Sequence, residues 1–494
     1  MPKPLSISNP RQFLGHVSIY GLGRILRQLI GFIMLPIYTR YLSPADYGII
    51  SLMIFAISLI EITIGARIGQ AIPKYYYEME DVNKQAGVIS TAMILTGVVT
   101  AILSFIMIFF RDSASQLIFG THANSAIVGC FAVLLFTQAM EYYALIYIRI
   151  KKKPFLYIIL NLIKLLLQLS LNIWFVVIHS FGVIGIAISS LVSSLIFSII
   201  LLSYTFYHVG LRFSGDFAFK MLKFSWPLWL AGIGSLYIES ANRYYLRLFA
   251  SMEDIGLYEL ASKFSAVITL LIWDPFETYW QVERFNYYRR GNDNSIFKNV
   301  FQVISSMLLI GGLVLSFYSK PILQLIANPV FYKAGESVPF LVFAAVFNCL
   351  ISYFNFSFLI KEKTEWITRN NYLIAIFVTI FYLLLIPLMG HKGAALALML
   401  AQSIQLIIVY RASGKLFDMK ISKKNLIGIF IIAVCSCLIV NNLLIFNNLI
   451  EDLIIKTFFL LIISMIILLP IWKNVELRFF FKKLFLELTL VKRS

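Results

Sequence analysis

Two arginines stand near the middle of the first long apolar segment of the chain. Arg24 and Arg27 interrupt the stretch SIYGLGRILRQLIGFIMLPIY, residues 18–38, and on a helix they share one face. A charge at the centre of a bilayer costs roughly 3 kcal/mol on insertion scales, so such residues face the protein interior or a water-filled cavity. A guanidinium presents a planar fork of donors that suits phosphate oxygens. The pair therefore predicts a wet internal site for an anionic lipid head group.

Further ionisable residues lie inside apolar segments. At ~1.5 Å per residue, Arg24 lies ~12 Å and Arg27 ~16 Å from the end of their segment. Glu61, Lys164, Glu239 and Lys263 are also deep, which leaves a positive excess among the deep charges. Glu141, Arg67, Arg243, Arg247, Asp274 and Glu277 lie nearer a membrane surface by the same measure.

These positions divide by chemistry into two sets of candidates. The predicted substrate-binding residues are the cations Arg24, Arg27, Lys164, Lys263, Arg67 and Arg243. The predicted ion-coupling residues are the carboxylates Glu61, Glu239, Asp274 and Glu277, because a deep carboxylate can exchange protons.

Each candidate also has a structural interpretation. Arg24 or Arg27 could pair with Glu61 and hold two helices together, and Glu239 and Arg243, four positions apart, could neutralise each other. Lys164 could be a solvated strut, and Arg67 and Arg247 could be interface anchors. Tyr75–Tyr77 and Tyr142–Tyr143 are more typical of an aromatic belt than of a sugar-stacking platform.

The composition indicates a protein that uses the bilayer as solvent. The 494 residues are 60% hydrophobic and only 13% charged, with a mean hydropathy of +0.84. Soluble domains are about 45–50% apolar and about 25% charged. No cleavable signal peptide is evident, and the four cysteines lie in apolar stretches as small hydrophobic residues. The sequence has no metal-ligand cluster and no catalytic motif, so we expect no metal, no cofactor and no enzymatic activity.

Fourteen segments are long and apolar enough to span a membrane, at about 20 residues per span. They cover residues 16–38, 46–72, 86–110, 122–148, 154–178, 181–206, 224–249, 254–280, 296–317, 338–360, 366–388, 391–410, 425–446 and 453–472. Most of the 42 Lys and Arg residues fall in loops on one side, such as RIKKKP (149–154) and ERFNYYRR (283–290). This asymmetry predicts cytoplasmic termini. The net charge of +18 then reflects loops that meet anionic lipid, and nucleic acid is not needed to explain it.

An internal repeat relates the two halves of the chain. YLSPADYGIISL (41–52) returns as FASMEDIGLYEL (249–260), and FGVIGIAISSL (181–191) aligns at the same spacing with MGHKGAALALM (389–399). KKKPFLYIILN (151–161) similarly resembles KEKTEWITRNN (361–371). Spans one to six therefore map onto spans seven to twelve in the same orientation, as in parallel-repeat transporters. The predicted domains are residues 1–210, 211–412, two extra helices at 413–472, and a basic amphipathic tail at 473–494 on the cytoplasmic side.

The span pattern, the stretch YLSPADYGIISL and the arginines of the first span resemble the polysaccharide-flippase branch of the multidrug/oligosaccharidyl-lipid/polysaccharide exporter superfamily. The bacterial O-antigen and capsular repeat-unit flippases are the most similar group. The resemblance implies an all-α membrane protein with 14 transmembrane helices. Two parallel six-helix repeats would form a V-shaped, MATE-like arrangement, followed by two extra helices.

The resemblance also implies a function. It implies a transporter that works by alternating access. The cargo would be an oligosaccharide on undecaprenyl pyrophosphate, which moves from the cytoplasmic to the periplasmic leaflet of the bacterial inner membrane. Cationic residues of the first helix engage the pyrophosphate in related flippases, and Arg24 and Arg27 fit that role here. Membrane lipids, a coupling proton or sodium ion, and polysaccharide polymerase or assembly proteins are the implied partners.

Other functions compete with this one. A lipid II-type peptidoglycan-precursor flippase and a teichoic-type precursor flippase would use the same mechanism. A MATE-type drug or cation antiporter would favour an acidic, aromatic cavity, whereas the deep charges here are mainly positive. A membrane-embedded glycan polymerase or ligase should carry a large external catalytic loop, and the longest expected outer loop is only about residues 318–338.

Overall fold

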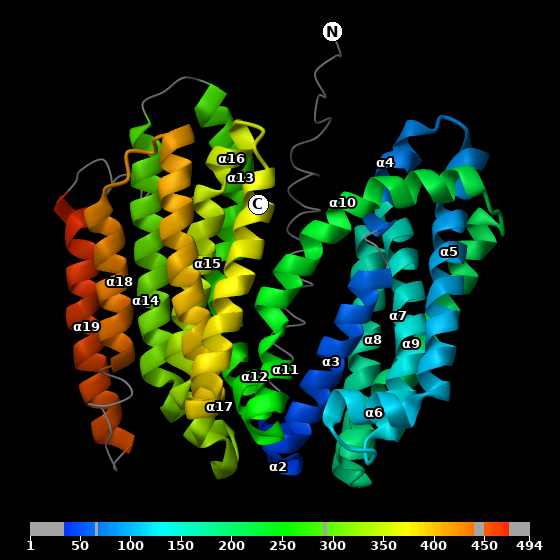
Figure 1. The fold of residues 1–494 in the computed structure, drawn as a ribbon, viewed down its shortest axis with the longest axis horizontal. Helices are drawn as coiled ribbons and strands as arrows, with labels where there is room; N and C mark the ends of the chain where they lie inside the picture. Colours follow the sequence, from blue (N-terminus) through cyan, green and yellow to red (C-terminus); the bar gives the residue numbers. More distant parts are fainter. Residues whose placement is uncertain (1–33, 65–67, 290–293, 439–448, 474–494) are drawn as a thin grey trace. The chain divides into compact units, whose positions relative to one another are not determined.

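The computed structural model describes residues 34–64, 68–289, 294–438 and 449–473, and in these ranges every regular element is a helix (Figure 1). Ten of the described helices are long and apolar enough to cross a membrane. The expectation of an all-helical membrane protein is therefore confirmed. The count of fourteen spans stays a prediction, since most of the first expected span, 16–38, lies outside the described residues.

The chain divides into two compact units, residues 1–244 and 245–494. The described helices of the first unit are α2 Leu35–Tyr41, α3 Pro44–Ile64, α4 Ile68–Glu78, α5 Val82–Phe109, α6 Arg111–Phe119, α7 Ser125–Ile150, α8 Pro154–Asn172, the π-helical turn η1 Ile173–Ile178, α9 Gly182–Val209 and α10 Gly215–Ser240. Helix α11, Asn242–Phe249, begins in the first unit and ends in the second.

Helix α7 is the central helix of the first unit. It packs against α5 on one side and α9 on the other, and 72% of its most apolar stretch is buried (Figure 1). None of the corresponding stretch of α8 is buried, although the segment is similarly apolar. Because apolar surface left outside the core of a membrane protein is stable in lipid, we expect α8 to face the bilayer, while α7 forms the scaffold.

The second unit contains α12 Met252–Ile268, the π-helical turn η2 Thr269–Trp273, α13 Asp274–Arg289, α14 Ser295–Ile326, the 3-10 helix η3 Pro329–Glu336, α15 Val338–Phe354, α16 Phe356–Ile360, α17 Glu365–Leu416, α18 Lys423–Leu438 and α19 Leu449–Lys473. Its core helix is α15, which packs against α12, α14 and α17. The segment 283–290, expected as a loop, is helical as far as Arg289.

The two halves share backbone details at the repeated motifs. Ser43 and Ser251 each accept a hydrogen bond from the backbone N–H of the aspartate three residues later, at 3.2 and 3.1 Å, and each serine hydroxyl donates back to that carboxylate. This reciprocal cap satisfies donors that a helix start leaves free. The glycines Gly182 and Gly390 both adopt a positive φ, 57° and 54°.

The basic turns that enter the next helix are also alike. Lys152 and Glu362 have φ values of 54° and 55°, which few non-glycine residues adopt. The residue that follows each one donates a backbone hydrogen bond five positions back, from Lys153 to Ile148 and from Lys363 to Phe358. The same left-handed turn thus ends the preceding helix in both halves.

Helix α10 is the first helix of the second repeat by sequence, yet it packs on the first unit. It contacts α3, α4 and α5, and it bends over its length in Figure 1, with Pro227 in its interior. A proline there removes a backbone hydrogen bond and kinks the helix. The division by contacts therefore follows Tyr244, whereas the repeat-based boundary at residues 210 and 211 stays a prediction.

Candidate functional site

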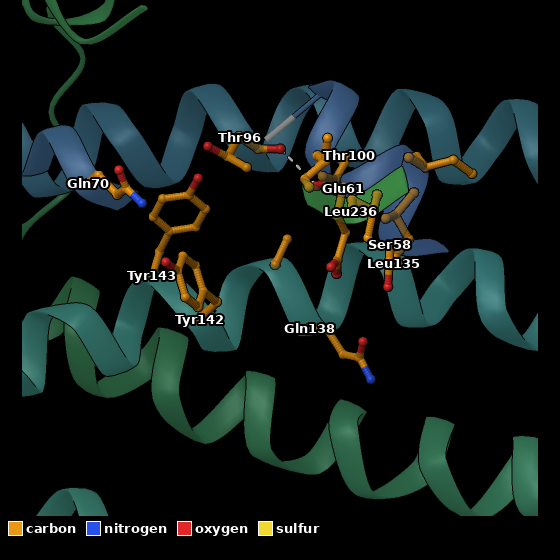
Figure 2. A pocket seen from close by; sticks show the side chains of 13 residues that line it. Ser58, Glu61, Gln70, Thr96, Thr100, Leu135, Gln138, Tyr142, Tyr143 and Leu236 are labelled. Carbon is orange, nitrogen blue, oxygen red and sulfur yellow. Dashed lines mark hydrogen bonds between the residues drawn. The ribbon is translucent and has the colours of Figure 1, made fainter. Parts of the chain in front are cut away.

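The first unit contains a cavity of about 530 Å³ whose wall comes from α3, α4, α5, α7 and α10. Its described lining residues are Ser58, Ile60, Glu61, Ile62, Gln70, Thr96, Thr100, Leu135, Gln138, Ala139, Tyr142, Tyr143 and Leu236 (Figure 2). The volume falls in the range of about 300–1,000 Å³ that is usual for small-molecule sites. Three of the five helices that form the wall, α3, α5 and α7, are long and apolar enough to cross a membrane, so the cavity lies among membrane-length helices.

Glu61 is the one charged residue among the described lining residues. Figure 2 shows its side chain extending from α3 toward α7, where Gln138 lies. No described residue forms a hydrogen bond or ion pair with its carboxylate. A carboxylate at this depth that faces a cavity is available to a ligand, to water or to a cation.

Uncharged polar groups also line the cavity, with Gln70 beyond Tyr142 and Tyr143 from Glu61 in Figure 2. Gln70, Gln138 and Ser58 offer donors and acceptors, and the Thr100 hydroxyl donates to the backbone carbonyl of Thr96 at 2.7 Å. An amide side chain can donate and accept at once. The wall can therefore hydrogen-bond to a polar ligand that carries no charge.

Two adjacent tyrosines complete the wall. The rings of Tyr142 and Tyr143 meet edge to face, with centroids 5.4 Å apart and planes at 81°. Tyr143 is only 3% exposed, whereas Tyr142 is 50% exposed. Both tyrosines line the cavity, and this placement differs from the aromatic belt that the sequence favoured.

Lys164 does not line this cavity. Its ammonium forms an ion pair with Glu141 of α7, and Glu141 is 5% exposed. The other carboxylate oxygen of Glu141 lies 2.5 Å from the Ser194 hydroxyl of α9, which is also 2.8 Å from the Thr137 hydroxyl. Three helices thus share one satisfied polar cluster, and a substrate role for Lys164 stays a prediction.

Arg243 ties two helices of the first unit together. Its Nε donates to the Ser51 hydroxyl of α3 at 2.7 Å, and one terminal nitrogen donates to the backbone carbonyl of Glu239 at 3.4 Å. The expected pairing of the Arg243 and Glu239 side chains stays a prediction. The roles of Arg243 and Glu239 in binding or coupling stay predictions.

The candidates in the second unit lie on two consecutive helices. Lys263 of α12 has Glu259 as an acidic neighbour one turn earlier. Asp274 is the first residue of α13, and Glu277 accepts a hydrogen bond from the indole N–H of Trp273 at 2.7 Å. Arg24, Arg27 and Arg67 lie outside the described residues.

Sequence reasoning found Glu61 but missed the uncharged part of the wall. Gln138 and Tyr142 are four positions apart on α7, as are Thr96 and Thr100 on α5, so each pair shares one helix face. That spacing was the available signal. Charge alone does not single out these residues, because isolated uncharged polar side chains are common in apolar helices.

Comparison with solved structures gives the fold of the whole chain. A lipid II flippase, MurJ, in an inward closed conformation matches with a TM-score of 0.73 at 13% identity, and the match covers 92% of this chain and 99% of that one. A multidrug resistance MATE family transporter in an inward-facing conformation matches with a TM-score of 0.60 at 13% identity, covering 80% and 93%. At such identities the likeness concerns the fold.

Sequence comparison adds the family. The family model described as polysaccharide biosynthesis protein matches residues 13–278, more than half of the chain, and those residues include the whole cavity wall. No curated protein matches the chain in sequence. The chain therefore belongs to the polysaccharide biosynthesis protein family, and it has the fold of the MurJ and MATE transporters.

Proposed function

We propose that the chain is a lipid-linked oligosaccharide flippase. It moves polysaccharide repeat units on undecaprenyl pyrophosphate from the cytoplasmic to the periplasmic leaflet by alternating access. The observation that carries this proposal is the cavity of about 530 Å³, where Glu61 and several uncharged polar side chains stand in a mainly apolar wall, in a chain of the polysaccharide biosynthesis family. A hydrophilic head group cannot cross hydrocarbon unless such a cavity replaces its water.

The cargo has three parts with different chemical needs. The sugars need hydrogen-bonding groups, and the polyprenyl tail can stay in lipid and pass through a gap between helices. The pyrophosphate needs cations, because desolvating a dianion without compensation is prohibitive. Arg24 and Arg27 are our candidates for that contact, with Lys164, Lys263, Arg67 and Arg243 as further candidates.

The proposed setting follows from the charge asymmetry of the loops. The protein would lie in the bacterial inner membrane with both termini in the cytoplasm, among anionic lipids. Polysaccharide polymerase and assembly proteins would receive the product. Coupling to protons or sodium ions would use the carboxylates Glu61, Glu239, Asp274 and Glu277, of which Glu61 lines the cavity.

The structural neighbours define the alternatives. Because a lipid II flippase matches the fold, a peptidoglycan precursor is an alternative substrate, together with teichoic-type precursors. The matched MATE transporter leaves a drug or cation antiporter as a second alternative function. The carboxylate and the two tyrosines of the described lining would also suit a cation, so the preference for a glycan rests on the uncharged polar groups of the wall and on the family match.

The test is deletion of the gene in the native host, followed by identification of the lipid-linked saccharide that accumulates. We expect one undecaprenyl-pyrophosphate oligosaccharide to build up on the inner leaflet and surface polysaccharide to disappear. Re-expression of the wild-type chain should reverse both. Accumulation of lipid II would identify the peptidoglycan alternative, and unchanged glycan lipids with altered drug sensitivity would identify the antiporter.

A further inference from the structure

The cavity of the first unit is a poor site for the pyrophosphate. The charge on its described wall is the carboxylate of Glu61, and no Lys or Arg is among its described lining residues. Like charges repel strongly where the local dielectric is low. Lys164 is paired with Glu141, and Arg243 donates to the Ser51 hydroxyl. The described wall therefore suits an uncharged, hydroxylated part of a cargo better than an anionic one.

The wall matches a ligand with many hydroxyl groups. A hydroxyl both donates and accepts, and the amides of Gln70 and Gln138 can answer both needs. The Glu61 carboxylate only accepts, and its two oxygens can take hydrogen bonds from two neighbouring hydroxyls at once. Hydrogen bonds to an ionised acceptor are roughly twice as strong as neutral ones. Glu61 therefore suits a vicinal diol.

The aromatic part of the wall matches the remaining face of a sugar. Tyr142 is half exposed, and Tyr143 packs edge-on against it and fixes its plane. A pyranose has an apolar C–H face and a hydroxylated rim. An aromatic ring can cover the C–H face while polar groups form hydrogen bonds with the hydroxyls of the rim. Leu135 and Leu236 add apolar surface to the same wall.

The platform that carries these groups is rigid. Gln138 and Tyr142 stand on α7, the most buried helix of the first unit. Between them, Glu141 anchors α7 to α8 and α9 through Lys164 and Ser194. A site built on a fixed helix holds its groups more accurately than one built on loops.

We propose that the Glu61 cavity is the sugar subsite of this transporter, which binds a pyranose through a vicinal diol on Glu61, the amides of Gln70 and Gln138, and the ring of Tyr142. This inference rests on the proposed function for its substrate class, and it separates the sugar contact from the pyrophosphate contact. On this inference Glu61 contributes to sugar recognition, a role separate from ion coupling.

Binding of soluble sugars tests the subsite without any transport. The full-length protein in lipid nanodiscs would be probed by saturation-transfer NMR with the methyl pyranosides of glucose, galactose, mannose and N-acetylglucosamine. Inorganic pyrophosphate would serve as the anionic probe. At least one pyranoside should show saturation transfer to its ring protons, and its affinity should fall at least about tenfold in Glu61→Ala and in Tyr142→Ala.

Conservative variants separate recognition from ion coupling. Glu61→Gln keeps one acceptor and should lose only about threefold to fivefold in sugar affinity, and Tyr142→Phe should bind nearly as well as the wild type. Glu80→Gln and Tyr207→Ala are matched controls, since both residues are exposed and lie outside the wall, and they should bind as the wild type does.

Three results would overturn the subsite. The first is no saturation transfer to any of the four pyranosides. The second is pyrophosphate binding that is lost in Glu61→Ala. The third is a sodium or pH dependence of the protein's NMR spectrum that Glu61→Gln and Glu61→Ala abolish equally, while both variants bind sugar as the wild type does. Failure of the flippase itself would appear differently. Sugar binding at Glu61 would persist while deletion in the host left the glycan lipids unchanged.

Discussion

The carboxylate of Asp254 accepts a hydrogen bond from the backbone N–H of His391 at 3.0 Å, across 137 positions of the chain. The contact joins the first turn of α12 to the kink of α17, where Gly390 has φ 54° and ψ −132°. The Asp254 side chain lies so near that a Cβ built on Gly390 would clash with its Oδ1. The internal repeat thus places a helix cap and a glycine kink in direct contact within the second unit.

Replacing Gly390 with alanine should destabilise the protein by about 2–4 kcal/mol. Positive φ is unfavourable for alanine, and the new methyl group would displace the Asp254 carboxylate that the kink needs. Thermal unfolding of the detergent-solubilised protein measures the loss as a lower midpoint. Gly414→Ala is the control in the same helix, because a Cβ there meets nothing within 4 Å. An equal midpoint for both variants would contradict the role of the kink.

Lys164→Met should destabilise the protein more than the double variant Lys164→Met/Glu141→Leu. The single change leaves the 5% exposed Glu141 as an uncompensated charge, which for a buried pair costs about 3–5 kcal/mol. The double change removes both charges, and it should recover most of the loss. The same unfolding assay applied to the two single variants and the double variant gives the coupling energy. Additive effects would show that the pair contributes no coupling.

The fold class was predictable because it follows from local chemistry. Apolar runs of about 20 residues can only be membrane helices, and the Ser251 and Asp254 cap is readable as a helix start. The end of α13 was not predictable from local chemistry. The segment 283–290 has the charges of a loop, yet its Arg284 is 5% exposed and lies over the rings of Phe285 and Phe356. Aromatic neighbours far along the chain allowed that burial, and local composition does not reveal them.

The site was predictable only where it is charged. Glu61 stood out because a deep carboxylate is rare, whereas Gln138 resembles any isolated polar residue in a helix. Glu141 was expected nearer a membrane surface, and the structure buries it in an ion pair with Lys164. Glu141 and Lys164 lie at similar distances from the turn at Lys151–Lys153, so the hairpin of α7 and α8 places them side by side. Depth measured on each helix separately does not capture such a pairing.

Lys151 gives a prediction about pH. The Tyr76 hydroxyl, as a hydrogen-bond partner, raises the pKa of this loop lysine, and its ammonium lies 5.7 Å from the ring centres of Tyr76 and Tyr147. A raised pKa favours the protonated form in the folded state. Its stabilisation is therefore complete below the unfolded pKa of about 10.4 and is lost as the pH rises through the raised value.

The variant Lys151→Met measures this contribution. Its unfolding midpoint should lie about 1 °C below that of the wild type from pH 6 to pH 9, and the difference should shrink above about pH 10.4. Lys152→Met, at the exposed neighbouring position, is the control and should show no such trend. A difference that grows at high pH would reverse the sign of the argument and refute it.

Replacing both Arg24 and Arg27 with alanine should abolish transfer of the lipid-linked glycan while the protein stays in the membrane. Each charge-assisted hydrogen bond to phosphate contributes about 1.5–3 kcal/mol. The loss of two such bonds should therefore decrease transfer by roughly a hundredfold or more. The measurement is the amount of lipid-linked glycan left on the inner leaflet of a deletion strain that expresses the variant. Immunoblotting of the membrane fraction verifies insertion.

Two further variants make that result specific to the guanidinium pair. Arg24→Lys/Arg27→Lys keeps the charge but not the planar fork, and it should retain partial transfer. Arg40→Ala removes an exposed arginine near the end of α2 and should leave transfer intact. Because the sugar subsite holds no lining cation among its described residues, the double alanine variant should also keep the pyranoside binding of the wild type. Normal transfer by the double alanine variant would move the pyrophosphate contact away from the first span.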